Sequence, residues 1–373
     1  MVSRRSTSTV PFQNHHPFKI GILRESYDKW ERRAPLCPER VQAFLDRHPL
    51  SEVVVQPSRN RVFTNQEYEN VGARVQDDLS DVDLILGVKR PKSMSSLPSD
   101  KTYMFFSHVI KGQTGNMSLL QDCLDKRVQL LDYECIVDRD SSGTAKRRIA
   151  FGEYAGCAGM IDTFPVLGRR LLMKNDWSTP FLNCPPAIHH YDLKEAKRSV
   201  VHMAERIAAE GLPEDMEPLV FAMTGKGGNV YSGVRQIFDI LPHEVVSVEN
   251  LPELQKLRGP QHKVYAVAPE KHEMFQRTVD GEAFFERSDY MKNPHFYQSV
   301  FAEKIAPYST VIMNCAYWDH RFPRILTKDD IHDLYMNGNE RCVSGWPRDC
   351  RGTKPHSIWF ALCIPQAHDC VRH

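Results

Sequence analysis

The chain has 373 residues, of which 41% are hydrophobic and 25% are charged, and its formal net charge is +1. These values are ordinary for a globular protein, and the near-neutral charge gives no field that would attract nucleic acid or a membrane surface. No apolar run approaches the roughly 18 residues of a membrane-spanning helix, and the length predicts two domains. Ten cysteines lie far apart without a Cys-x-x-Cys pair, which predicts reduced thiols rather than a disulfide framework.

The N-terminal segment is rich in Ser and Thr, contains Arg4 and Arg5, and has no acidic residue before Glu25. This composition is typical of a transit peptide, but the segment is short and prolines interrupt it. Residues 1–17 are therefore predicted to be either a targeting segment or a disordered tail. A targeting segment would direct the protein to the mitochondrial matrix, and a plain tail would leave it in the cytoplasm.

Strands alternate with helices in the first part of the chain. Apolar runs predict strands at residues 18–23, 53–55, 82–88, 103–106 and 128–131. Helices are predicted from Pro38, which suits a first helical turn, over residues 65–75 and over residues 117–125. This alternation predicts an α/β fold with a parallel sheet covered on both faces, in a first domain over residues 18–150.

A second domain is predicted over residues 151–341. Small residues from Ala155 onward start a long apolar helix, and because small residues permit close backbone packing, this helix is predicted to run between the two domains. Further predictions are a loop at 172–192, a helix at 193–210, strands at 243–248, 263–268 and 309–316, and a last helix at 328–335. Residues 342–373 contain four cysteines and no clear period, and we interpret them as an atypical tail.

The stretch from Pro218 to Gly233 has the strand–turn–helix context of a dinucleotide-binding loop. Gly225 and Gly227 can adopt backbone angles closed to other residues, and without side chains they let a pyrophosphate approach the amides at a helix start. The match to Gly-x-Gly-x-x-Gly is imperfect, because Val230 occupies the third glycine position, and Gly233 could make the close helix–strand contact instead. The alternative is a glycine-rich turn of an ordinary α/β protein.

Polar side chains follow three predicted strands: Lys89, His108 and Glu134. Since ligands bind beyond the carboxyl ends of strands in open α/β sheets, these side chains could share one cleft. Lysine serves as a base when burial or nearby positive charge lowers its pKa, and histidine exchanges protons near neutrality. The alternatives are a solvated lysine and a structural histidine. Arg32 and Arg33 follow the first strand, where they could equally form weak surface pairs with glutamates.

Metal binding and serine-nucleophile chemistry have little support in the residues. His189 and His190 beside Cys184 lack metal-ligand spacing, and the irregularly spaced cysteines of the tail make a poor zinc site. No Gly-x-Ser-x-Gly motif is present in the sequence. No metal is therefore expected.

Several separated stretches resemble one known family. They are residues 30–38 (WERRAPLCP), 84–91 (LILGVKRP), 103–111 (YMFFSHVIK), 150–156 (AFGEYAG), 224–230 (TGKGGNV) and 314–318 (NCAYW). In this order they resemble lysine–ketoglutarate reductase, the N-terminal half of the bifunctional α-aminoadipic semialdehyde synthase, over about residues 18 to 341. This family belongs with alanine dehydrogenase and saccharopine dehydrogenase.

The resemblance implies two Rossmann-like domains with parallel sheets flanking a central cleft, the first for the amino acid and keto acid and the second for the nucleotide. It implies an oxidoreductase of lysine degradation that joins L-lysine and 2-oxoglutarate and reduces the imine with NADPH to give saccharopine. The implied partners are these small molecules, with no nucleic acid and no membrane. A homo-oligomer is compatible with the sequence.

By motif, Lys89 and His108 match the acid–base pair of the related dehydrogenases. Arg33, with Arg32 beside it, matches the arginine that holds a substrate carboxylate, and Glu134 matches an acidic position that could hold a substrate ammonium. Arginine binds a carboxylate bidentately, and imine formation needs both a base and an acid. The implied cofactor-binding residues are Gly225, Gly227, Gly228, Asn229, Val230 and Asn314.

Two departures from the family pattern leave alternatives open. The strand after the glycine turn ends at Glu249, about where an acid would bind a ribose 2′-hydroxyl and favour NAD, whereas the resemblance implies NADPH. Lys256 or Arg258 could neutralise a 2′-phosphate. The family's sequence after about Asn339 and its saccharopine-oxidising half do not appear in this chain. The alternatives are therefore a truncated, non-catalytic chain that binds nucleotide or a partner, and a sibling saccharopine or alanine dehydrogenase.

Overall fold

The computed structural model describes residues 17–336, apart from residues 113, 140–142, 144, 279–284 and 319. It divides into two compact units, residues 1–150 and 151–373. The predicted tail at 342–373 and residues 1–16 of the predicted N-terminal tail lie outside the described residues. Within the described part, no helix combines the length and the apolar character needed to cross a membrane.

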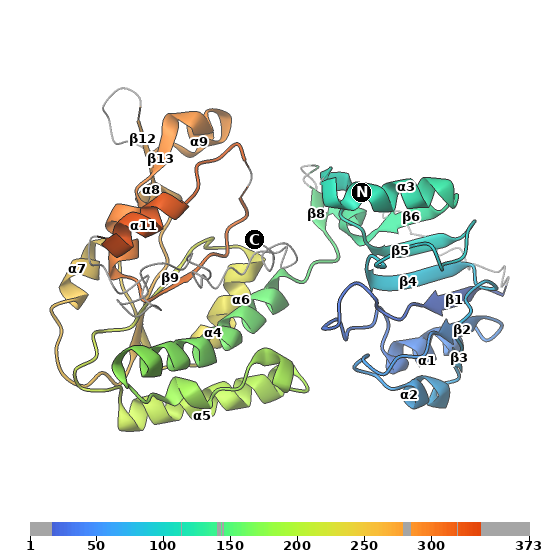
Figure 1. Ribbon diagram of the computed structural model, residues 1–373, viewed down its shortest axis with the longest axis horizontal. Helices are drawn as coiled ribbons and strands as arrows, with labels where there is room; N and C mark the ends of the chain where they lie inside the picture. The colour runs from blue at the N-terminus through green and yellow to red at the C-terminus, as the bar shows by residue number, and fades with distance from the viewer. Residues whose placement is uncertain are drawn as a thin grey trace, which may run out of the picture. The chain divides into compact units, whose positions relative to one another are not determined.

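The first unit is built on a sheet of six parallel strands (Figure 1). They are β1 (Lys19–Ile22), β2 (Glu52–Val55), β3 (Arg74–Val75), β4 (Leu84–Lys89), β5 (Thr102–Phe106) and β6 (Gln129–Asp132). The sheet order is β3-β2-β1-β4-β5-β6, so the chain winds outward from β1 in one direction and from β4 in the other. The carboxyl ends of β1 and β4 therefore mark the topological switch point, where doubly wound sheets bind ligands.

Helices cover both faces of this sheet, with α1 (Pro38–Arg47) and α2 (Asn65–Asn70) on one face and α3 (Thr114–Asp125) on the other (Figure 1). Alternate strand residues supply the two faces, since Val54 packs into one buried cluster and Val55 into the other. Burial on both sides explains why these strands read as continuous apolar runs in the sequence.

Two features of the first unit differ from the predictions. The helix predicted over residues 65–75 ends at Asn70, because Gly72 adopts a left-handed backbone (φ +88°) and turns the chain into β3. A short antiparallel hairpin of β7 (Val137–Arg139) and β8 (Ala145–Arg147) was not predicted, because neither strand shows apolar periodicity. Two one-turn 3-10 helices follow β5 and β6, and they are η1 (Val109–Lys111) and η2 (Tyr133–Cys135).

The second unit contains a sheet of four parallel strands in the order β10-β11-β9-β14. They are β9 (Val220–Met223), β10 (His243–Val245), β11 (Val264–Val267) and β14 (Val311–Met313). The chain leaves β9 for one side of the sheet and later places β14 on the other side, so the carboxyl ends of β9 and β14 form the switch point of this unit. The strand predicted over residues 243–248 ends at Val245, and η5 (Val248–Asn250) follows it.

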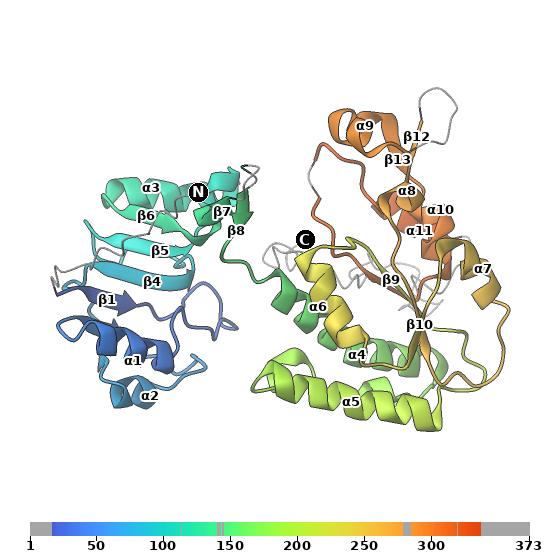
Figure 2. The ribbon, with the colours of Figure 1, turned by 180° about the vertical axis from the view of Figure 1, so that it is seen from behind.

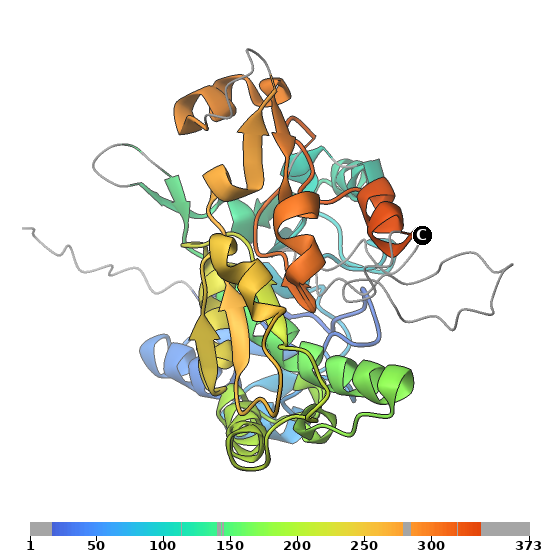
Figure 3. The same ribbon diagram turned by 90° about the vertical axis from the view of Figure 1, so that its left-hand side faces the viewer.

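Helices also cover both faces of the second sheet (Figures 2 and 3). One face packs against α4 (Gly152–Asn175), α5 (Leu193–Glu210) and α6 (Asn229–Phe238). The other packs against α7 (Leu251–Leu254), α8 (Lys271–Met274), α10 (Phe301–Lys304) and α11 (Lys328–Met336). The same side carries an antiparallel ribbon and a short helix, which are β12 (Phe275–Arg277), β13 (Tyr297–Ser299) and α9 (Arg287–Lys292).

The long helix α4 corrects one prediction. It continues to Asn175, so the loop predicted at 172–192 begins later, and that loop contains the 3-10 helices η3 (Pro180–Asn183) and η4 (Ala187–His189). The small residues of α4 permit close packing against α6.

Two glycines make the contact between α4 and α6 possible. A Cβ atom on Gly156 would overlap the carbonyl oxygen of Val230, and one on Gly233 would overlap the carbonyl oxygen of Glu153. Gly233 therefore serves a helix–helix contact, whereas the sequence suggested a helix–strand contact. This crossing fixes where α6 begins, and the glycine-rich loop lies directly before that point.

Candidate active site

The loop after β1 encloses Lys89, the last residue of β4. The Lys89 Nζ atom lies 2.7 Å from Asp28 Oδ2 and 3.1 Å from Glu31 Oε2. The Lys89 side chain is 13% exposed and that of Glu31 only 4%. Lys89 is therefore a partly buried cation held by two carboxylates at the switch point, and not the solvated surface charge considered as the alternative.

Arg33 binds the same carboxylate from the other side. Its Nε and Nη2 atoms donate to Glu31 Oε1 and Oε2 at 2.8 and 2.7 Å, while 52% of its side chain remains exposed. Burial raises the pKa of Glu31, but the hydrogen bonds and charge of Arg33, together with the charge of Lys89, outweigh burial and lower it to about 2. Glu31 is thus an ionised carboxylate that bridges two cations. The sequence had left open that Arg33 forms only a weak surface pair with a glutamate, and the structure does not show such a pair.

His108 forms a second charged group at the end of β5. Its Nδ1 atom lies 2.7 Å from Glu134 Oε2, and Arg147 Nη1 lies 2.7 Å from Glu134 Oε1. The Glu134 side chain is 3% exposed. A buried carboxylate on Nδ1 orients the imidazole ring.

The backbone of His108 adopts a left-handed conformation (φ 57°), which is uncommon for a residue other than glycine. Asp132 holds this turn, because its Oδ2 atom accepts hydrogen bonds from the backbone N–H groups of Ser107 and His108 at 3.3 and 3.2 Å. The Ser107 hydroxyl donates to the same oxygen atom. Strain of this kind persists where surrounding contacts impose it, and such sites are often functional.

The two groups lie at one edge of the sheet. In the β4–β5 register Lys89 pairs with Phe106, and His108 follows two residues later. Glu134 follows the adjacent strand β6. The structure therefore brings Lys89, Arg33, His108 and Glu134 to the carboxyl edge of one sheet, whereas Arg32 donates from Nε to the backbone carbonyl of Asn60 at 3.3 Å, outside these contacts.

Several members of this site were not predicted as site residues from the sequence. They are Glu25, Asp28, Glu31, Asp132 and Arg147. Three of these follow β1 within nine residues, so a count of carboxylates after the first strand, at the same predicted edge as Lys89, was the available signal. No such signal existed for Arg147, because its hairpin shows no pattern.

The glycine-rich loop lies at the switch point of the second unit. Gly225 and Gly227 have φ values of +75° and +84°. A Cβ atom on Gly225 would lie 2.6 Å from the backbone carbon of Cys315, whereas one on Gly227 would meet nothing within 4 Å. Gly225 therefore closes the loop onto the segment after β14, and Gly227 faces open space where a ligand can approach.

The start of α6 offers backbone N–H groups rather than side chains. Gly228 stands at the N-cap position and cannot cap the helix with a side chain. Asn229 is exposed, while Val230 is 5% exposed and its side chain packs in the core, so Val230 would contact a ligand through its backbone. Asn314 is fixed beside the loop, since the Thr224 hydroxyl donates to Asn314 Oδ1 at 2.7 Å. These features suit a pyrophosphate, which binds helix N-termini through backbone amides.

The sheet order argues against Glu249 as the acid that binds the ribose. This residue is exposed in η5 after the edge strand β10, but the strand beside β9 is β11. Glu270, which follows β11, forms a 2.9 Å ion pair with Lys226 of the glycine-rich loop. Lys256, proposed for a 2′-phosphate, pairs with Glu253 at 2.6 Å. The acid next to the loop is therefore Glu270.

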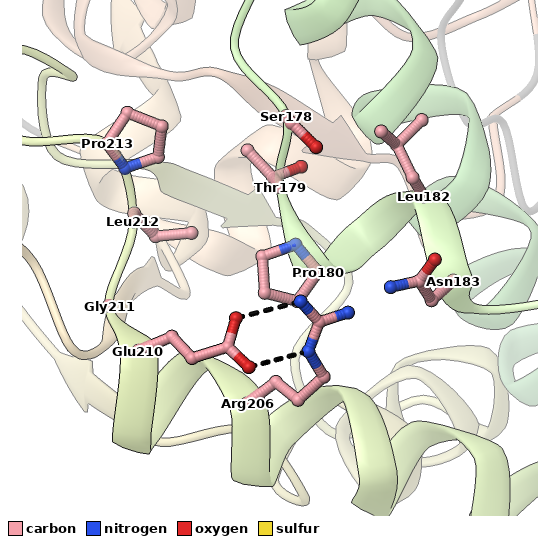
Figure 4. Close-up of a pocket in the computed structure, with 10 residues that line it drawn as sticks. All are labelled: Ser178, Thr179, Pro180, Leu182, Asn183, Arg206, Glu210, Gly211, Leu212 and Pro213. Carbon is pink, nitrogen blue, oxygen red and sulfur yellow. Dashed lines mark hydrogen bonds and ion pairs between the residues drawn. The ribbon is translucent and has the colours of Figure 1, made fainter.

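A hollow elsewhere in the second unit is unrelated to the sequence-predicted site residues (Figure 4). Arg206 and Glu210, one turn apart on α5, pair at 2.8 Å and line it together with Thr179 and Asn183. Among the described residues, no group of three or more His, Cys, Asp or Glu side chains is placed to hold a metal ion.

Comparisons with known proteins agree with this architecture. Residues 21–158 match the family described as alanine dehydrogenase/PNT, N-terminal domain. The chain is 42% identical over 333 residues to α-aminoadipic semialdehyde synthase of Arabidopsis thaliana, covering 86% of this chain and 30% of that protein. It is 38% identical over 349 residues to the mitochondrial α-aminoadipic semialdehyde synthase of Rattus norvegicus, covering 94% and 36%. A saccharopine dehydrogenase [NAD(+), L-lysine-forming] of Neurospora crassa is 26% identical over 212 residues, covering 56% and 53%.

The parallel sheets of both units define an α/β fold. Residues 21–158 are similar to the alanine dehydrogenase/PNT N-terminal domain, and most of the chain is similar to part of the α-aminoadipic semialdehyde synthases. The resemblance inferred from the sequence is confirmed. The chain spans about a third of the length of the two synthases it matches.

Proposed function

We propose that this protein is an oxidoreductase that condenses L-lysine with 2-oxoglutarate and reduces the imine with NADPH to give saccharopine. The observation that carries the proposal is the cluster at the first switch point, where Glu31 joins Lys89 to Arg33, with His108 and Glu134 at the same sheet edge. The names of the relatives support lysine metabolism as its setting.

Each polar residue has a role that fits this reaction. The two substrates carry three carboxylates, and Arg33, whose side chain is half exposed, binds one of them. His108, oriented by Glu134, accepts the proton of the substrate ammonium. Lys89, held by Asp28 and Glu31, donates a proton to the departing hydroxyl. In this scheme Arg32 contributes less to substrate binding than Arg33, because its Nε atom already donates to the backbone carbonyl of Asn60.

The nucleotide belongs to the second unit in this proposal, with residues 18–150 for the substrates and 151–341 for the cofactor. Gly225, Gly227 and the first amides of α6 would hold the pyrophosphate, and Asn314 would border it. The bound nicotinamide supplies hydride. Lys226 and Glu270 lie beside the loop, and in this proposal these two charged side chains decide between NADPH and NADH.

A second candidate is a sibling saccharopine dehydrogenase that uses NAD, which the match to the Neurospora crassa enzyme favours. A third is a non-catalytic chain that binds nucleotide or a partner. We also propose the mitochondrial matrix as the compartment, because the mammalian relatives are named mitochondrial.

Substrate omission tests the proposal and separates the candidates. The absorbance of NADPH should fall only when L-lysine and 2-oxoglutarate are both present. The absorbance of NADH should fall more slowly under the same conditions. Faster turnover with NADH would favour the sibling enzyme. Nucleotide binding without turnover in either case would contradict the proposed reaction and support the non-catalytic chain.

A further inference from the structure

Glu25 occupies a place in the cluster to which the proposed reaction gives no role. The β4–β5 register shifts between Leu86 and Lys89, so the end of β4 is irregular. At this irregularity the Glu25 carboxylate accepts two backbone N–H groups of β4, from Val88 at 2.6 Å and from Lys89 at 3.1 Å. One side chain of the β1 loop thus fixes the backbone that carries Lys89.

The space around this carboxylate is tight. A Cβ atom on Gly87 would lie 3.2 Å from Leu23 Cδ1, 3.3 Å from the carbonyl oxygen of Lys89 and 3.5 Å from Glu25 Oε1. The first two distances are shorter than an ordinary van der Waals contact, so a side chain at position 87 would have to displace its neighbours. The path of the backbone from Leu86 to Lys89 is therefore held by Gly87 and by Glu25 together.

The charges around Glu25 do not balance when every group is ionised. Glu25, Asp28 and Glu31 supply three negative charges, and Lys89 and Arg33 supply two positive charges. The groups that face Glu25 are Glu31 and Arg33 from its own loop and Tyr133 from η2. A substrate carboxylate at Arg33 would add a further negative charge, and like charges close together favour protonation of one of them.

The pKa of Glu25 agrees with this imbalance. Burial raises the pKa of Glu25 more than the two backbone hydrogen bonds and the charge of Arg33 lower it, and the resulting pKa is about 7. A protonated carboxyl still accepts hydrogen bonds through its oxygen atoms, so Val88 and Lys89 keep their partner in both states. Glu25 is thus the carboxyl of the cluster that can change its charge near neutral pH.

We propose that Glu25 is a positioning residue that holds the irregular end of β4 under Lys89 and takes up a proton when an anionic substrate carboxylate binds beside Arg33. The second half of this proposal rests on the proposed function. The first half concerns the ligand-free protein alone. Proton uptake leaves two positive and two negative charges on the cluster, so the incoming carboxylate meets no net repulsion from it.

The ligand-free half is tested by NMR on the full chain labelled with ¹⁵N-valine and ¹⁵N-lysine. The amide signals of Val88 and Lys89 should shift together between pH 5.5 and pH 8.5 along one titration curve, and Glu25→Gln should abolish that curve. Glu69→Gln, which removes an exposed carboxylate on α2, should leave it unchanged. Amide signals that do not change with pH would refute the titration of Glu25 near neutral pH, and signals that titrate equally in Glu25→Gln would refute its contact with β4, whether or not the protein is an enzyme.

Proton uptake is tested by calorimetry of 2-oxoglutarate binding at pH 7.5 in two buffers that differ in ionisation enthalpy. Wild type and Glu69→Gln should take up a fraction of a proton, and Glu25→Gln none. The KM for 2-oxoglutarate should rise severalfold from pH 6.5 to 8.5 in wild type but stay nearly constant in Glu25→Gln. Equal proton uptake in all three proteins would overturn the linkage. Absence of 2-oxoglutarate binding in wild type would refute both this linkage and the proposed substrate, while the NMR result would stand.

Discussion

At the scale of single residues, Glu31 is the carboxylate that pairs with both Lys89 and Arg33, the two cations proposed to act on the substrates. It receives both donors of the Arg33 fork and also contacts Lys89 at 3.1 Å. A buried carboxylate shared by two cations fixes their distance from each other, as substrate positioning requires. Its own ionisation is therefore part of the site, and it can be followed through stability.

Replacement of Glu31 by Gln should destabilise the protein at neutral pH and matter less in acid. The folded-state pKa of Glu31 lies below its ordinary value of 4.5, at about 2, so its ionised form stabilises the fold above about pH 4.5. That contribution, at most about 3 kcal/mol, is lost as the pH falls toward 2. Urea unfolding of wild type and Glu31→Gln at pH 7 and pH 3 measures the difference, and a difference independent of pH would contradict it.

Lys89→Met should lower kcat/KM by about 10²- to 10⁴-fold, because a positioned acid is removed while the apolar stem of the side chain is kept. Steady-state kinetics with both substrates measure the change. The matched control is Lys19→Met, which removes an ion-paired lysine at the opposite, amino end of β1 in the same sheet. A loss of similar size in both variants would mean that the effect is general and not catalytic.

Sequence alone could place Lys89, His108 and Glu134 at one edge, because the carboxyl ends of parallel strands meet there. It could not identify Glu31 as the partner of both Lys89 and Arg33, since loop residues have no periodicity that shows where their side chains point. The roles proposed for these residues remain predictions that the variants test.

At the scale of elements, the crossing of α4 and α6 depends on the absence of side chains. Gly156→Ala should destabilise the protein by at least about 3 kcal/mol, because the added Cβ atom would overlap backbone atoms of α6. Gly152→Ala, whose Cβ atom would lie 3.2 Å from Asn229 Cβ, should cost less than about 1.5 kcal/mol. Urea unfolding measures both variants.

The control for this series is Gly115→Ala in α3, where an added Cβ atom meets nothing within 4 Å. Alanine is the better helix former by up to about 1 kcal/mol, so this variant should be as stable as wild type or more stable. Equal effects of the substitutions at 115 and 156 would refute the close packing of α4 against α6.

The elements with strong apolar periodicity could be predicted, and the others could not. The helix predicted at residues 193–210 is α5, because its buried side recurs with helical spacing. The helix predicted at 65–75 was too long, because Gly72 ends it and two residues join the sheet. The hairpin β7–β8 has exposed polar residues on both strands, so no local pattern distinguishes it from a loop.

At the scale of the whole molecule, both sheets are doubly wound and each has a loop cluster at its switch point. The alternation of strands and helices predicted parallel sheets, but it could not predict that β11 and not β10 lies beside β9. That order depends on which crossover packs best, and it decides whether Glu249 or Glu270 adjoins the glycine-rich loop.

We propose that the first unit binds the substrates and the second binds the nucleotide, so a variant in one unit should weaken the binding of one ligand and not of the other. Gly227→Asp places a carboxylate where the pyrophosphate is proposed to bind, so it should weaken nucleotide binding at least about tenfold through charge repulsion. It should leave 2-oxoglutarate binding unchanged. Arg33→Met should weaken 2-oxoglutarate binding and leave nucleotide binding unchanged. Calorimetry with each ligand measures both, and loss of both ligands in either variant would contradict separate sites.

The proposed reaction passes hydride to an imine made from lysine and 2-oxoglutarate. Mass spectrometry of the product formed with NADPH deuterated at the transferring carbon follows that hydride. Wild type should give saccharopine carrying one deuterium, and Lys89→Met or His108→Gln should reduce its rate of formation at least about a hundredfold. Recovery of unreacted lysine, 2-oxoglutarate and deuterated nucleotide, from a protein that binds all three, would contradict it.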